Sequence, residues 1–382
     1  MYPFMKLVPI PLSLLRCPVD QLPLQAEGTT LLCKQNHRHR TENGIHLLLT
    51  PTTTIEEEHV RQTMQTFYET HTFPGYDGID NPGILMDKAR KSAFGLWVDQ
   101  AIPPMATVLE VGCGTGQMTN FLGLVQTRTV IGVDMSLPSL KLGQGFKERF
   151  SLHNVHFAQG NIFAMPIAEN SIDVLICSGV LHHTPDPKGG FQNLLRLLRP
   201  GGNILIGLYN TYARLPLGLR KTFFTITKGS CRWMDAHMRR RDVDRSKKEI
   251  WFADQYRNPH ESWHGVDEVL CWFDESNVQF LSAVPQVSQS LPGKESGLRL
   301  FEKHPHGSPF EHILRQLAWM FTIGREGGLF VMIGKKEGGS PSPTAVGEGK
   351  GERAYCPPSH EPSPPSPPPL RRGRGEGWGD TV

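Results

Sequence analysis

The sequence predicts an α/β fold with a mostly parallel sheet flanked by helices. Short apolar or β-branched runs alternate with helix-length segments between about residues 80 and 210. Such alternation is typical of βαβ units joined by right-handed crossovers. Three glycines, Gly112, Gly114 and Gly116, follow one of these runs, and Asp134 ends the next one. Because ligands bind such sheets beyond the carboxyl ends of the strands, the same observations locate a candidate site.

Five buried strands are expected in the central zone, each bounded by Gly, Asp or Asn. They cover residues 107–112, 129–134, 155–160, 172–179 and 203–210. Helix-length segments lie between them at 116–126, 137–150 and 189–202. The last segment has an apolar face that includes Leu194 and Leu198, and Pro200-Gly201-Gly202 stops it.

The glycine loop indicates a nucleotide-like ligand. Glycines let the chain turn tightly and let a ligand approach main-chain N–H groups, and the following helix points its N-terminus at the same place. Asp134 is placed to accept hydrogen bonds from ribose hydroxyls. The structural alternative is a glycine turn that only permits close helix–strand packing. A dinucleotide fingerprint would need glycine where Gln117 stands, and a phosphate-binding P-loop would need a Gly-Lys-Ser/Thr sequence that is missing from the loop.

At this point the sequence resembles the class I S-adenosylmethionine-dependent methyltransferases, closely over residues 105–210. "VLEVGCGTG" is similar to their first motif and "VIGVDMS" to their second. "GNIFAMPIAENSIDVLICSGVLHHTPDP" and "LLRLLRPGGNILI" are similar to the branch with the quinone-biosynthesis C-methyltransferases. The resemblance implies a Rossmann-like seven-stranded sheet whose last strand is antiparallel, an enzyme of class EC 2.1.1.-, and S-adenosyl-L-methionine as cofactor. The cofactor-binding residues it implies are Glu110, Gly112, Cys113, Gly114, Gly116, Asp134, Met135, Asn161, Ile162 and Ser178.

One of these residues departs from the family pattern. Many relatives have Asp, which binds the adenine amino group, where this chain has Asn161. Its side-chain carbonyl can still accept that hydrogen bond, but without the charge. Ile162 would then pack on the adenine ring.

The segment after the fourth strand supplies two candidate catalytic residues. His182 and His183 lie in "SGVLHHTPDP", which faces the methyl group in this fold. Methyl transfer depends largely on positioning, and a base is required only if the acceptor must lose a proton. Two adjacent side chains cannot both do the same job. Either histidine could instead cap a helix or pack under the loop.

A polar and aromatic cluster in residues 251–273 is a candidate acceptor pocket. The residues expected to contact substrate there are Tyr256, His260 and His264, together with Tyr76 from the turn-rich stretch 73–81. The alternative is a surface-loop hydrogen-bond network. His260, Glu261 and His264 have metal-ligand side chains, but we expect no metal here. The stripe Val266, Val269, Leu270 and Phe273 has helical spacing and is read as core.

Residues 214–248 are basic, with 11 Lys or Arg against 3 Asp. Such a stretch could contact the phosphates of RNA or lipid. A solvated helix face is the more common role, and no aromatic-interleaved RNA platform is visible nearby.

The units flanking the core differ in composition. Residues 1–50 resemble a small zinc-ribbon-like module found ahead of some bacterial methyltransferases. Asp20 and Asn36 replace the second cysteine of each pair, so only Cys17 and Cys33 remain, with His37 and His39 as substitutes. We expect a metal-free relic of that module, and zinc binding by the remaining ligands stays open as the alternative. Residues 51–104 are expected to form a helical lead-in and substrate lid, and residues 211–335 a substrate-side region that completes the sheet. Residues 336–382, with 10 Pro and 9 Gly, are expected to be a disordered tail.

Composition excludes several other classes. The 382-residue chain has a formal net charge of +3, which gives no case for a nucleic-acid partner. Its seven cysteines are scattered, which argues against a disulfide-stapled secreted protein and for a reducing compartment. Prolines break the apolar N-terminus, and no run is long enough to span a membrane. We therefore expect a cytoplasmic protein with no membrane span.

The sequence therefore predicts a methyltransferase acting on a small-molecule or lipid-like acceptor. Three alternatives stay open: an RNA methyltransferase using residues 214–248, an NAD-dependent oxidoreductase, and a non-catalytic cofactor-binding regulator. Neither the acceptor nor the oligomeric state follows from the sequence.

Overall fold

The computed structural model describes residues 10–50, 55–70, 74–227, 235–239, 245–288 and 299–338. The tail predicted from residue 336 lies almost wholly outside these residues. Within them, no helix combines the length and the apolar character needed to cross a membrane.

A mixed sheet organises the fold. Its central strands lie in the order β7-β6-β5-β8-β9-β11-β10. The parallel core consists of β5 (Thr107–Val111), β6 (Thr129–Asp134), β7 (Val155–Gln159), β8 (Ile172–Ser178) and β9 (Leu198–Tyr209). β10 (Val278–Val284) and β11 (Leu329–Lys336) complete it, and β11 is antiparallel to both of its neighbours. The predicted seven-stranded arrangement with an antiparallel last strand is confirmed.

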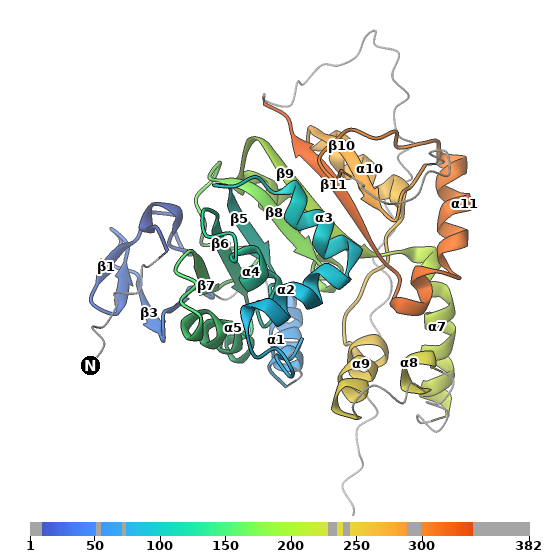
Figure 1. The fold of residues 1–382 in the computed structure, drawn as a ribbon, viewed down its shortest axis with the longest axis horizontal. Helices are drawn as coiled ribbons and strands as arrows, with labels where there is room; N and C mark the ends of the chain where they lie inside the picture. Colours follow the sequence, from blue (N-terminus) through green and yellow to red (C-terminus); the bar gives the residue numbers. More distant parts are fainter. Residues whose placement is uncertain are drawn as a thin grey trace, which may run out of the picture.

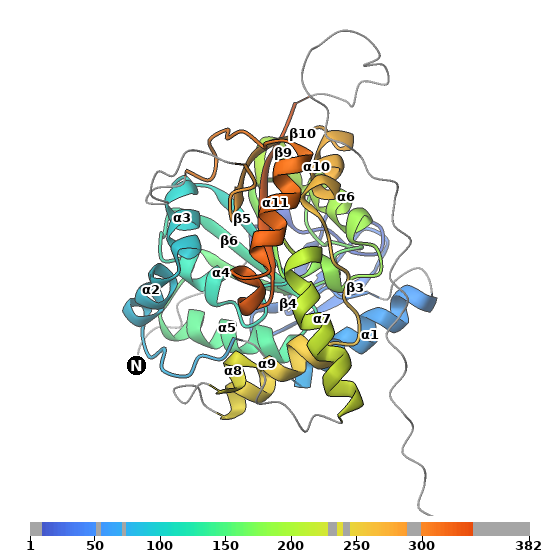
Figure 2. The same ribbon diagram turned by 90° about the vertical axis from the view of Figure 1, so that its right-hand side faces the viewer.

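Helices cover both faces of this sheet. α2 (Pro82–Lys91), α3 (Ala93–Ala101), α4 (Gln117–Leu122) and α5 (Leu137–Arg149) lie on one face, and α6 (Pro187–Leu197) and α10 (Val266–Glu275) on the other (Figures 1 and 2). Each face buries its own apolar core, with Phe121 and Phe157 in one and Phe191 and Phe273 in the other. The strand residues are buried on both faces, as their continuous apolar runs predict.

Two helices are shorter than the sequence pattern predicts. α4 ends at Leu122 rather than near residue 126 because Gly123 follows and the chain turns into β6. α6 ends at Leu197, and Leu198 already pairs with Ile172 as the start of β9. The proline and glycines at 200–202 therefore lie within an irregular strand start, not at the helix end.

The N-terminal module extends the sheet at the β7 edge (Figure 1). β1 (Gln25–Glu27), β2 (Thr30–Leu32), β3 (Arg38–Glu42) and β4 (Ile45–Leu47) pair antiparallel in sequence, after a short 3-10 helix, η1 (Leu12–Leu14). β4 then pairs parallel with β7, and His46 lies opposite Ala158. The sequence did not predict this continuation, because the strands are only three to five residues long.

The remaining helices surround the carboxyl ends of the strands and the opposite edge of the sheet. They are α1 (Ile55–Thr70), η2 (Leu181–His183), α7 (Thr211–Ile226), α8 (Ala236–Arg239), α9 (Arg245–Arg257), α11 (Pro309–Trp319) and η4 (Ile323–Glu326). The stripe predicted as core on α10 is buried as expected. Cys17, Cys33, Cys113 and Cys177 are free thiols, whereas Cys271 is disulfide-bonded, which the scattered cysteines did not predict.

Candidate cofactor and acceptor site

The loop after β5 needs its glycines for two reasons, the backbone conformation they adopt and the close packing around them. Gly112, Gly114 and Gly116 have φ values of 69°, 53° and 71°, the left-handed region that side chains other than glycine rarely adopt. A Cβ on Gly112 would lie 2.1 Å from Cγ2 of Val180, and one on Gly116 would lie 2.5 Å from the ring of Phe157. Local packing therefore accounts for part of the glycine pattern.

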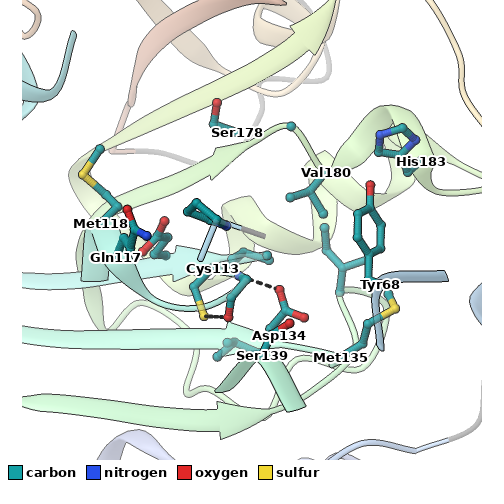
Figure 3. Close-up of a pocket in the computed structure, with 18 of the residues that line it drawn as sticks. Tyr68, Cys113, Gln117, Met118, Asp134, Met135, Ser139, Ser178, Val180 and His183 are labelled. Carbon is teal, nitrogen blue, oxygen red and sulfur yellow. Dashed lines mark hydrogen bonds between the residues drawn. The ribbon is translucent and has the colours of Figure 1, made fainter. Parts of the chain in front are cut away.

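Asp134 links the glycine loop to the next strand. Its Oδ2 accepts a hydrogen bond from the backbone N–H of Gly114 at 2.8 Å (Figure 3). Its Oδ1 accepts one from the backbone N–H of Ser136, also at 2.8 Å. Burial raises the pKa of this carboxyl, while the N–H groups that it accepts from act in the opposite direction. An ionised carboxylate has about four acceptor sites, so it can accept further bonds from ligand hydroxyls.

Glu110 lies beside this acid at the end of β5. Burial raises the pKa of the Glu110 carboxyl to about 7, the hydroxyl and N–H of Thr119 lower it, and the negative charge of Asp134 raises it further. The Thr119 hydroxyl donates to Oε2 of Glu110. Because the pKa of Glu110 is about 7, a positively charged group that binds next to this carboxyl favours its ionised form.

These groups open into a cavity of about 620 Å³. Cys113 and Asp134 lie next to each other, the Met135 side chain lies beside Tyr68, and the phenol of Tyr68 points toward His183 (Figure 3). Of the residues expected to bind cofactor, those lining the cavity are Glu110, Gly112, Cys113, Gly114, Asp134, Met135, Ile162 and Ser178. The set combines a hydroxyl-accepting acid, apolar surfaces and a second carboxyl, which fits a nucleoside carrying a positive charge.

Gly116 and Asn161 do not belong to this lining. Gly116 is the N-cap residue of α4. Asn161 is buried, and its Oδ1 accepts from the backbone N–H of Phe163 at 3.1 Å. The carbonyl expected to receive an adenine amino group therefore already has a partner, and its Nδ2 is left without one.

The two adjacent histidines have different surroundings. His182 is fully buried, stacks on Tyr209 with ring centroids 3.8 Å apart, and has no hydrogen-bond partner at either ring nitrogen. Burial first, and nearby positive groups second, lower its pKa well below the ordinary value. His183 lines the cavity. Its Nδ1 lies 2.7 Å from the carbonyl oxygen of His260. A carbonyl only accepts, so Nδ1 carries the proton and Nε2 is the acceptor of the neutral ring.

The four residues expected to contact substrate lie outside the cavity lining. Tyr76 accepts a hydrogen bond from Asn120 at 2.8 Å and stacks on Phe146. Tyr256 donates to Asp235 within an aromatic cluster. His260 Nε2 lies 3.0 Å from the carbonyl oxygen of Thr184, and His264 bridges Glu268 and Ser262 at 2.9 and 2.8 Å. These contacts stabilise the residues around the cavity. They agree with the alternative that the sequence left open, in which the polar cluster forms a hydrogen-bond network and does not contact substrate.

Other aromatic residues form the far wall of the cavity. They are Phe67 and Tyr68 of α1, Tyr209 at the end of β9, and Trp251 of α9, with Gln255 one turn further on. The sequence offered only a weak signal for them, since α1 precedes the core and α9 follows it, each at no fixed spacing. Residues 51–104 were expected to provide a lid, and Phe67, Tyr68 and Pro74 do line the cavity.

A fully buried arginine holds this wall together. The Arg214 guanidinium lies 3.7 Å over the Tyr209 ring and donates to Oε1 of Gln255 at 2.5 Å. It also forms an ion pair with Glu261 at 2.5 Å. Arg214, the first basic residue of the 214–248 stretch, therefore stabilises the protein interior and takes no part in a phosphate-binding surface.

Groups that could hold a metal lie elsewhere. His260, Glu261 and His264 bind different partners, Thr184, Arg214 and Glu268. In the N-terminal module, by contrast, Cys17, Asp20, Cys33 and His37 bring one ligand atom each within 4.8 Å of one another.

Residues 104–266 match a family model described as a methyltransferase domain. An uncharacterized protein of Synechococcus sp. is 26% identical over 58% of this chain and 60% of its own length. The demethylmenaquinone methyltransferase of Lactococcus lactis is 30% identical over 29% of this chain and 44% of its own length. The solved geranyl diphosphate C-methyltransferase of Streptomyces coelicolor is 15% identical, covers 65% of this chain and 75% of its own, and has a TM-score of 0.38. The chain thus spans about half the length of the curated relatives it matches.

Proposed function

We propose that this chain, whose residues 104–266 match a methyltransferase domain, is a class I S-adenosylmethionine-dependent methyltransferase that moves a methyl group to a small, lipid-like acceptor. The observation that carries the proposal is the division of one cavity into two kinds of wall. The glycine loop and Asp134 form one wall, and aromatic side chains with a single histidine form the other.

S-adenosyl-L-methionine is the methyl donor of this domain family, and it supplies a methyl group on a sulfonium. The chain's own residues fit it as follows. Asp134 accepts from the ribose hydroxyls, and Met135 and Ile162 offer apolar surfaces to the base. Glu110, as a carboxylate, compensates positive charge on the ligand. Asn161 accepts a hydrogen bond from the backbone N–H of Phe163 and makes no adenine contact in this proposal.

The aromatic wall supports an apolar acceptor with a flat or unsaturated part. Phe67, Tyr68, Tyr209 and Trp251 offer ring faces and edges, which bind apolar and aromatic groups well. Because the buried Arg214 and Gln255 fix this wall, the acceptor enters a pocket that is already formed.

His183 is the residue we assign to proton removal or acceptor contact. Its Nδ1 is committed to the carbonyl of His260, and its Nε2 lies 3.5 Å from Asn258 Nδ2. An acceptor hydroxyl or acidic carbon that replaces this long contact with Asn258 can give its proton to Nε2. His182 has no such role in the proposal, because it is buried behind Tyr209.

Labelled S-adenosylmethionine incubated with the protein and fractionated cell extract tests the acceptor class. We expect label in the solvent-extractable, apolar fraction. Label found in RNA would favour the alternative that uses residues 214–248. Binding without transfer to any fraction would favour a non-catalytic cofactor-binding regulator, and binding of a nicotinamide cofactor an oxidoreductase.

A further inference from the structure

The N-terminal module contains four metal-ligand side chains that converge on one point. Cys17 Sγ and Cys33 Sγ lie 3.5 and 3.4 Å from His37 Nδ1, and Asp20 Oδ2 lies 3.0 Å from the same nitrogen. Cys33 Sγ also lies 3.1 Å from Asp20 Oδ2. Ligands about 2.0–2.3 Å from a tetrahedral ion lie roughly 3.3–3.8 Å from one another. Four of the six separations, at 3.0–3.5 Å, are thus close to those of a tetrahedral site, and the other two are within 4.8 Å.

Two matched turns place these ligands. In the first, the N–H of Gln21 donates to the carbonyl of Cys17, and that of Cys17 to Leu22, both at 2.8 Å. In the second, the N–H of Asn36 donates to Cys33 at 3.0 Å, and that of Cys33 to His37 at 3.2 Å. Each turn supplies a buried cysteine and one further, less buried ligand, Asp20 or His37.

We infer that Cys17, Asp20, Cys33 and His37 form a structural zinc site in which a carboxylate replaces one thiolate. Two thiolates, one imidazole and one carboxylate are all ligands that zinc accepts, and thiolates select it over magnesium or calcium. This inference reverses the expectation of a metal-free relic. The spacing argument counted only cysteines as ligands, whereas Asp20 can supply a ligand atom at the position of the second cysteine.

The site fastens the module against the wall of the cofactor cavity. The Arg16 N–H donates to Pro166 at 2.9 Å and the Ala168 N–H to Leu14 at 2.8 Å. Cys17 and Cys33 pack in the same apolar cluster as Ile162 and Met165, which line the cavity. Loss of the metal should therefore loosen this wall and weaken cofactor binding by about tenfold.

Metal analysis of the purified full-length protein tests the site. We expect about one equivalent of zinc per chain, and cobalt substitution should give the absorption of a tetrahedral thiolate site. Cys33→Ser should lose the metal, and the matched control Cys177→Ser, which removes a buried thiol outside the module, should keep it. Asp20→Cys should hold the metal and strengthen the thiolate-to-cobalt band. Folded protein without metal, or a cobalt spectrum that Asp20→Cys leaves unchanged, would overturn the inference.

A second feature, independent of the first, is an apolar surface on α7 and α11. Nine of the thirteen large apolar side chains that are exposed among the described residues lie there. They are Leu215, Leu219, Phe223 and Ile226 of α7, with Phe310, Ile313, Leu314, Leu317 and Phe321 on or just after α11. The two helices contact each other and face the same side of the molecule (Figure 2). So large a cluster marks an interaction site.

The charge of the surrounding sequence indicates which partner fits. Without the buried Arg214, residues 215–248, which include most of α7, carry 10 Lys or Arg against 3 Asp. A second copy of the chain on a two-fold axis would bring this excess against itself. An anionic phospholipid surface complements both the apolar stripe and the positive charge.

We propose that the α7–α11 surface binds the face of an anionic membrane. α7 follows directly after Tyr209, which lines the acceptor wall, so a bound membrane would lie near the source of a lipid-like acceptor. Only this last step rests on the proposed function, because vesicle binding is measured without acceptor or cofactor.

Co-sedimentation with phospholipid vesicles tests this surface. The protein should bind vesicles containing phosphatidylserine and not those of phosphatidylcholine alone. Leu219→Asp with Phe321→Asp should weaken binding at least about tenfold, whereas Met105→Asp, at an isolated exposed position, should bind as before. No binding to either vesicle, or a dimer in sedimentation that the double variant dissociates, would overturn the proposal. Retained binding of S-adenosylhomocysteine by the double variant would separate this result from a failure of the proposed function.

Discussion

Asp134 Oδ2 accepts a hydrogen bond from the backbone N–H of Gly114 at 2.8 Å. The acid that ends β6 and the loop that follows β5 are therefore one unit, built before any ligand arrives. Because neighbouring parallel strands end at the same edge of the sheet, residues 20 positions apart form a single binding wall.

Gly116→Ala should destabilise the fold more than the same substitution at another glycine with a positive φ. Gly116→Ala forces a side chain into the left-handed region and places its Cβ against Phe157. The two effects together should cost about 2–5 kcal/mol. Gly28→Ala is the matched control, since its φ is also positive but its Cβ meets open space, and it should cost about 1–2 kcal/mol. Urea unfolding measures both, and equal losses would contradict the packing argument.

Glu110 should give the protein a measurable dependence of stability on pH. Its pKa is raised from 4.5 to about 7 in the folded state, so between these values the folded chain binds more protons than the unfolded chain. The free energy of unfolding should therefore fall as pH rises through this window. Glu110→Gln should remove that part of the slope. Parallel pH curves for wild type and variant would show that the carboxyl is not perturbed.

His183 and His182 should differ sharply in their effect on methyl transfer. His183→Ala should lower the single-turnover rate of methyl transfer about 10²–10⁴-fold. The rate is measured with the acceptor that the labelling experiment identifies, and cofactor affinity should be unchanged. His182→Phe keeps a ring against Tyr209 and should transfer at close to the wild-type rate. The opposite ranking of the two variants would refute the assignment of His183.

Arg214 should be essential for stability although it has no direct role in the reaction. Arg214→Met leaves Glu261 buried with Lys221, 3.6 Å away, and the indole N–H of Trp263, 3.3 Å away, as its remaining partners. The cost should be about 3–5 kcal/mol, as for other broken buried pairs. Arg196→Met breaks an exposed pair with Glu169 and should cost at most about 1 kcal/mol. Thermal unfolding compares them, and adding Glu261→Gln to Arg214→Met should recover part of the loss.

The sequence predicted the parallel core well because each strand there is a continuous apolar run that ends in a turn residue. It also placed Gly112, Gly114 and Asp134 together at one edge of the sheet, since they follow local rules of turn and strand end, and these residues line the cavity. Their contacts with the cofactor stay a prediction. The sequence named the stretches 51–104 and 251–273 as lid and candidate acceptor pocket, but not the aromatic residues that line the far side of the cavity. Phe67, Tyr209 and Trp251 come from three elements far apart in the chain, and only tertiary packing brings them together. Tyr76, Tyr256, His260 and His264 were chosen for side-chain chemistry, but they are not among the residues that line the cavity.

The most direct test of the central claim is calorimetric titration of the folded protein with S-adenosylmethionine or S-adenosylhomocysteine. The account predicts saturable heat for the wild type and for the control Asp87→Asn, an exposed acid of α2. It predicts affinity about 10–100-fold lower for Asp134→Asn, because one charge-assisted hydrogen-bonding group is lost. No heat with either ligand, or undiminished affinity in Asp134→Asn, would contradict it.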